Sequence, residues 1–95
     1  MTFELSRLAQ YERDQYLYHL WADNPRAAAR EAQRLWTALQ EFAAAPIDGI
    51  EVTIPDWPRP ARMHYVKPFK VFYERRPHGL FVIRMYHHAR KPIER

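Results

Sequence analysis

The residues best suited to chemistry in this sequence are cations, and they gather in its last third. Residues 59–95 hold ten Lys and Arg against two acids, a net charge of +8, whereas residues 1–58 hold five against nine, a net charge of −4. Twelve of the fifteen cations are Arg, whose guanidinium makes paired contacts with phosphate or carboxylate. The basic third is therefore expected to face a polyanion or an acidic peptide, the alternative being a solvated surface with no dedicated partner.

Histidine is the other candidate for chemistry, because its side chain titrates near neutral pH. His87 and His88 are adjacent at the end of a predicted strand, so their side chains point to opposite faces and are not expected to share catalysis or a metal ion. His19 and His64 have no companion at metal-ligand spacing. The chain has no cysteine, which excludes a disulfide scaffold, a thiolate nucleophile and a Cys-based zinc site. We expect neither a metal nor another cofactor.

Two helices must come first among the elements that position these residues. A helix is predicted over 6–22, with Ser6 as its N-cap, and a second over 25–44, where Asn24 caps and Pro25 takes the first helical position. The second helix carries a clean apolar stripe with spacings of four and three residues. The pair should form an antiparallel helical hairpin.

Three strands should follow, over 62–66, 69–75 and 80–87, with residues 2–5 as a candidate fourth. The proline-rich loop between 55 and 60 is expected to be ordered by Trp57. Regular alternation in the last strand assigns side chains to two faces. The set predicted to pack against the helices is Phe81, Ile83, Met85 and His87. The set predicted to point away is Leu80, Val82, Arg84 and Tyr86, which puts Arg84 on an open face.

These elements predict a single α+β domain over residues 1–95. Its helical hairpin should pack on one face of a small antiparallel sheet of three to four strands. A hydrophobic fraction of 47% and an aromatic fraction of 15% are too high for a disordered chain. No apolar run reaches the roughly 18 residues of a membrane span, so we expect a cytoplasmic protein with no membrane partner.

The ordered set of motifs resembles the RelE/ParE superfamily, the toxins of bacterial type II toxin–antitoxin pairs, over nearly the whole chain. The motifs are Asp23-Asn24-Pro25 at the helical turn, Pro46-Ile47-Asp48-Gly49 after the second helix, Arg62, the run Phe69 to Tyr73, and the closing run Val82 to Arg90. The family's closing motif commonly reads Arg-Val-Leu-His-Gly-x-Arg-Asp, and it aligns with residues 84–91. His88 replaces the glycine and Lys91 reverses the acidic charge.

The RelE-like branch of this family implies ribosome-dependent cleavage of mRNA, which needs cations for the transition state and groups that transfer protons. The resemblance then makes Arg62, Lys70 and Arg84 the phosphate holders, with His87 or His88 as the proton-transfer group. His87 shares its predicted face with apolar residues, which favours a structural role. No cluster of Lys marks a heavily basic nuclease centre.

The ParE-like branch resembles the chain more closely, through its long helical hairpin and its His-x-x-Arg ending. That branch implies a growth inhibitor of the plasmid-stabilisation type that binds DNA gyrase without catalysis. The resemblance also implies a toxin–antitoxin hetero-oligomer, in which an acidic or amphipathic C-terminal segment of a cognate antitoxin crosses the basic sheet and the groove beside the hairpin. The expected target- or antitoxin-binding residues are Arg62, Arg84, His88, Arg90 and Lys91. A non-toxic nucleic-acid-binding module, with aromatic side chains stacking on single strands, is a further alternative.

Overall fold

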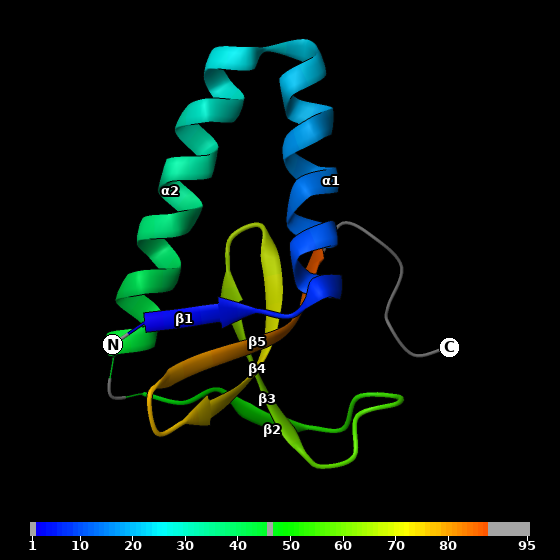
Figure 1. The fold of residues 1–95 in the computed structure, drawn as a ribbon, viewed down its shortest axis with the longest axis vertical. Coiled ribbons are helices and arrows are strands. Elements are labelled where there is room, and N and C mark those ends of the chain that lie inside the picture. The colour runs from blue at the N-terminus through cyan, green and yellow to red at the C-terminus, as the bar shows by residue number, and fades with distance from the viewer. Residues whose placement is uncertain (1, 46, 88–95) are drawn as a thin grey trace.

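The computed structural model describes residues 2–45 and 47–87 and has the predicted α+β architecture. Two helices, α1 (Arg7–Asp23) and α2 (Pro25–Ala44), pack on one face of a five-stranded sheet, and the tip of their hairpin projects beyond it (Figure 1). The strands are β1 (Thr2–Leu5), β2 (Ile50–Val52), β3 (Ala61–Val66), β4 (Phe69–Arg76) and β5 (Gly79–His87), in the spatial order β1-β5-β4-β3-β2.

The sheet is larger than predicted, and it is mixed rather than antiparallel. The candidate strand at residues 2–5 is real, and it pairs in parallel with β5, Thr2 opposite Gly79. The strand missed in the sequence is β2, whose three residues pair with β3 and are too few to show an alternating pattern. The prediction of three to four antiparallel strands is corrected to five strands.

The helices begin where their capping residues predict. The Ser6 hydroxyl accepts a hydrogen bond from the Ala9 amide at 3.0 Å, and the Asn24 side chain accepts one from Ala27 at 3.1 Å. Pro25 follows as the first residue of α2, where its missing amide hydrogen costs nothing. These local signals fix both ends of the short connection between the helices.

The main core lies between the helical hairpin and the sheet. Its central side chains are fully buried, and α2 contributes its predicted stripe through Leu35, Leu39 and Phe42. The sheet contributes Phe69, Val71, Tyr73, Leu80, Val82 and Met85. A second, smaller cluster on the opposite face packs the loop between β2 and β3 against the sheet. Trp57 packs in this cluster and holds the loop in place, as the sequence predicts. Its indole also donates a hydrogen bond to Glu74 at 2.9 Å.

The predicted faces of β5 are wrong for its first half and right for its second. Tyr73 pairs with Val82 and the adjacent Phe72 pairs with Arg84, so Ile83 is an additional residue in a β-bulge. Leu80 and Val82 therefore face the helices instead of pointing away.

The residues predicted to share the helix-facing side in that half, Phe81 and Ile83, belong to the smaller cluster on the opposite face. Met85 and His87 do face the helices as predicted, because they follow the bulge. Regular alternation fails wherever a strand contains an extra residue.

Gly79 begins β5 at a position that requires glycine. Its φ of +150° is rarely adopted by other residues, and a Cβ there would lie 2.3 Å from the Thr2 carbonyl oxygen. The close approach allows β1 to pair with β5 from its first described residue. Within the described ranges, neither helix is long and apolar enough to cross a membrane.

Candidate functional site

Arg84, the central candidate in the sequence, is held by a buried carboxylate of α1. Its guanidinium donates two hydrogen bonds to Glu12 Oε2, one of them from Nε at 3.0 Å. The other carboxylate oxygen accepts from the Met85 amide at 2.8 Å. Glu12 is only 5% exposed, so the pair is screened from water on the Glu12 side. The charge of Arg84 is therefore already compensated within the molecule by the carboxylate of Glu12.

This ion pair forms where α1 replaces a strand at the edge of β5. β1 ends at the level of Val82. Beyond that point, α1 and its N-cap residue form the hydrogen bonds to the backbone groups at the edge of β5. The Ser6 amide donates to the Val82 carbonyl at 2.9 Å, and the Ser6 hydroxyl donates to the Ile83 carbonyl at 2.6 Å. Glu12 continues the same edge at Met85. Arg84 is therefore part of the joint between helix and sheet.

The sheet face opposite the helices carries the rest of a basic and aromatic surface. Lys70 lies between Tyr65 on β3 and Tyr86 on β5 in the strand register. The Arg84 guanidinium lies over the Tyr86 ring at 5.5 Å. We call Tyr65, Lys70, Phe72, Arg84 and Tyr86 the open-face patch. Aromatic rings beside cations suit stacking and anion contacts.

Arg62 does not join this patch. It pairs across the strands with Tyr73, which faces the helices, and its guanidinium donates to the Gly49 carbonyl at 3.0 Å. It lines a polar pocket of about 360 Å³ together with Asp48 and Arg75. Arg75 donates to Asp48 and holds the pKa of that carboxyl below its usual range, while burial raises the pKa of the Tyr73 hydroxyl. The structure thus separates Arg62 from Lys70 and Arg84.

His87 lies on the helix side of the sheet. Its ring lies 5.3 Å from that of Tyr16 on α1 and 5.8 Å from that of Phe69, in an edge-on contact. Arg84 and Lys70 lie on the other face, so His87 cannot transfer a proton to a group bound at the open-face patch. The predicted structural role of His87 agrees with this position. The remaining predicted residues, His88, Arg90 and Lys91, lie outside the described residues.

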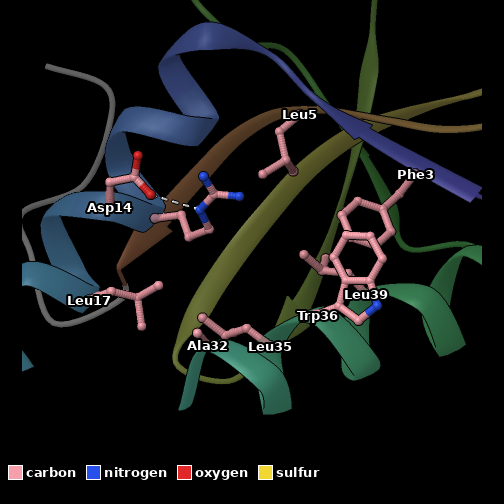
Figure 2. A pocket seen from close by; sticks show the side chains of 9 residues that line it. Phe3, Leu5, Asp14, Leu17, Ala32, Leu35, Trp36 and Leu39 are labelled. Atoms are coloured by element: carbon pink, nitrogen blue, oxygen red, sulfur yellow. Dashed lines mark hydrogen bonds and ion pairs between the residues drawn. The ribbon is translucent and has the colours of Figure 1, made fainter. Parts of the chain in front are cut away.

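A second candidate site is an apolar groove between the helices and β1. It has a volume of about 250 Å³, and Figure 2 shows side chains from all three elements around it. The lining residues are Phe3, Leu5, Arg13, Asp14, Leu17, Ala32, Leu35, Trp36 and Leu39. Phe3 and Trp36 pack together with ring centroids 4.8 Å apart, and Trp36 remains 54% exposed. A half-exposed tryptophan beside an apolar hollow is typical of a protein interface.

The sequence reasoning missed Glu12 and the Phe3–Trp36 pair. Glu12 lies three residues after Ala9 and four before Tyr16, so it falls on the buried side of α1. A lone acid at a core position signals a buried cationic partner, and that signal was available. The Phe3–Trp36 contact depends on the parallel placement of β1, which no local pattern indicates. Within residues 2–45 and 47–87, no cluster of three or more potential metal ligands occurs.

The chain was also compared with known proteins. No family model matches it, and no curated protein matches it. The resemblance to the RelE/ParE superfamily therefore remains a prediction from the motifs.

Proposed function

We propose that the protein is the toxin of a type II toxin–antitoxin pair, neutralised by a cognate antitoxin, and that it acts by binding DNA gyrase. The α+β fold, with a long helical hairpin over one face of the sheet, is the architecture that the motif resemblance implies. An exposed apolar groove and a separate basic face offer two surfaces for protein partners.

The observation that carries the choice of binding over RNA cleavage is the Glu12–Arg84 pair together with the place of His87. A cleavage site needs cations and proton-transfer groups converging on one phosphate. Here Arg84 is compensated by Glu12, His87 lies on the other face, and Arg62 lines a different pocket. Among the candidate residues that the structure describes, Lys70 is the only cation of the open-face patch that has no ion-pair partner.

The antitoxin is proposed to place an apolar anchor in the groove and acidic residues over the open-face patch. These two surfaces lie on opposite sides of the sheet, so the bound segment must pass around the β1 edge. Trp36→Ala should weaken antitoxin binding by more than tenfold, because an exposed tryptophan in a pocket is a typical hot spot. Ile50→Ala is the matched control, since Ile50 is an exposed apolar residue on β2, away from the groove.

Lys70→Glu is a cleaner test of the charged surface than Arg84→Glu, which would put a second carboxylate beside buried Glu12. Lys70→Glu should weaken antitoxin binding. Raising the salt concentration should then weaken binding by the variant less than binding by the wild type, because the variant has lost a charge contact that salt screens. Unchanged affinity in both Lys70→Glu and Trp36→Ala would contradict this placement.

The target is tested by controlled expression and by assays on purified components. We expect growth arrest with filamentation, relief of arrest by the cognate antitoxin, inhibition of gyrase supercoiling, and intact mRNA. Codon-biased cleavage of mRNA on ribosomes would instead support the RelE-like alternative. Binding to single-stranded nucleic acid with no effect on growth would support the binding-module alternative.

A further inference from the structure

Residues 48 and 49 form the one Asp-Gly pair in the sequence, and the fold uses both residues. The Asp48 carboxylate accepts a hydrogen bond from Arg75 Nε at 2.7 Å. A Cβ at position 49 would overlap the carbonyl oxygen of Met63 on β3, so the close approach of the chain to β3 requires glycine there. The Asp48 side chain is nonetheless 47% exposed. The fold thus places an Asp-Gly pair at a position that water reaches.

An Asp-Gly pair can rearrange without an enzyme, because an aspartate side chain reaches the following backbone amide and glycine has no side chain to hinder the reaction. The glycine nitrogen bonds to the side-chain carbon Cγ of the aspartate. Its proton leaves as water together with the hydroxyl of the protonated carboxyl group, and a five-membered succinimide ring remains. A second water then opens the ring at the main-chain carbonyl, so that the chain continues through Cγ as isoaspartate. One water is lost and one is gained, so the mass is unchanged and no oxidant or reductant takes part.

Tyr73 holds the nitrogen that would attack. The Gly49 amide donates its hydrogen to the Tyr73 hydroxyl at 2.7 Å, and Tyr73 is fully buried on β4. The proton that must leave is therefore bonded to an acceptor whose position is fixed by the core. The Gly49 carbonyl accepts from Arg62 at 3.0 Å, so hydrogen bonds hold both sides of this residue.

Arg75 holds the carboxyl group that would be attacked. Hydrogen bonding from Arg75 keeps the pKa of Asp48 below its usual range, and the ionised carboxylate reacts poorly because the departing oxygen must carry a proton. The same guanidinium donates to the carbonyl oxygens of Ala43 at 3.0 Å and Ile47 at 2.7 Å. It therefore fixes the backbone next to Asp48 as well as the side chain, and ties both to the end of α2.

We propose that Asp48-Gly49 is a site of spontaneous isoaspartate formation, which Tyr73 and Arg75 restrain in the folded protein. The reaction then takes place in molecules whose residues 47–49 have separated from β4, because separation breaks both contacts. Isoaspartate adds one carbon to the main chain just before β2 and moves the carboxylate that Arg75 binds, so the modified chain cannot restore the native contacts. The site thus limits the lifetime of the folded protein. This proposal does not depend on the proposed function.

The test measures isoaspartate in the full chain during incubation at neutral pH and physiological temperature. Methyl transfer by an isoaspartyl methyltransferase, with labelled S-adenosylmethionine, counts the modified residues, and mass-spectrometric fragmentation locates them. A synthetic peptide of residues 44–52 gives the unrestrained rate. We expect the folded chain to react at least about tenfold more slowly than the peptide. Equal rates in the chain and the peptide would overturn the proposal.

Two substitutions each release one of the reacting groups. Tyr73→Phe removes the acceptor of the Gly49 amide and keeps the ring, and Arg75→Lys keeps a cation but loses the paired geometry. Each should raise the rate several-fold toward that of the peptide. Tyr16→Phe is the matched control, since it removes a tyrosine hydroxyl bonded to Glu31 between the helices, and it should react like the wild type. Rates in both test variants no higher than in Tyr16→Phe would contradict the restraint.

Asp48→Asn tests the part played by Tyr73 without altering the core. An Asn-Gly pair closes the same ring by releasing ammonia and needs no protonated carboxyl group, so this variant removes the contribution of the ionised carboxylate. The folded variant should still release ammonia more slowly than the matching Asn peptide, because Tyr73 still binds the Gly49 amide. Equal rates would exclude Tyr73 as a restraint.

Discussion

Removing the Glu12 carboxylate should destabilise the protein far more than its single position on α1 suggests. Glu12→Ala leaves the Met85 amide without an acceptor at a fully buried position, at a cost of about 1–3 kcal/mol. It also leaves Arg84 unpaired. That side chain is 20% exposed and can turn toward water, so its share is about 1–2 kcal/mol, below the 3–5 kcal/mol typical of a fully buried broken pair. The expected total is about 3 kcal/mol.

Glu12→Gln separates charge from shape. Its amide oxygen can still accept from the Met85 amide, so the loss should be about 1–2 kcal/mol, mainly from the weakened contact with Arg84. Urea unfolding followed by tryptophan fluorescence measures the free energy of unfolding of both variants. In thermal unfolding, Glu12→Ala should lower the melting temperature by roughly 12–20 °C.

Asp14→Ala is the control for this experiment. Asp14 lies on the same helix, and its side chain is 61% exposed. In the described part of the chain it forms an ion pair with its neighbour Arg13. Its loss should change stability by no more than about 0.5 kcal/mol. A Glu12→Ala protein as stable as Asp14→Ala would refute the assignment of Glu12 as the joint between α1 and β5.

Three further predictions concern single residues. Burial and, secondly, the hydrogen bond to Glu31 raise the pKa of Tyr16 to about 12, above its usual value of 10.0, so stability present below pH 10 should be lost as pH rises from 10 toward 12. Unfolding of Tyr16→Phe should lack this part of the alkaline loss. His87→Ala should cost about 1–3 kcal/mol through lost ring contacts, and an unchanged melting curve would exclude its structural role. Gly79→Ala should cost about 2 kcal/mol or more and speed amide exchange in residues 2–5, whereas unchanged exchange there would show that β1 tolerates the extra methyl group.

Local signals predicted the helices because the capping residues act on their nearest neighbours. Ser6, Asn24 and Pro25 each satisfy or remove an amide within three positions, so their meaning does not depend on the rest of the fold. The paired strands at 62–66 and 69–75 were found for the same reason, since tight turns and prolines bound them.

The features that were missed depend on distant parts of the chain. The bulge at Ile83 arises where Val82 and Arg84 adapt to adjacent partners on β4, and alternation alone cannot reveal an extra residue. The grouping of Arg62 with Lys70 and Arg84 failed because their faces depend on the strand register. The distribution of charge along the sequence predicted a cationic last third of the chain. Only the packed structure shows that one of these cations, Arg84, is already paired with a carboxylate.

The parallel pairing of β1 with β5 has a consequence for how the protein folds during its synthesis on the ribosome. Thr2 pairs with Gly79, so β1 cannot begin to pair with β5 until 77 further residues have been synthesised. At roughly 5–20 residues per second, that interval lasts about 4–15 s. During it the apolar side chains of α2, including Leu35 and Leu39, have no completed sheet to cover them. The nascent chain therefore exposes an apolar helix surface until β5 has been synthesised.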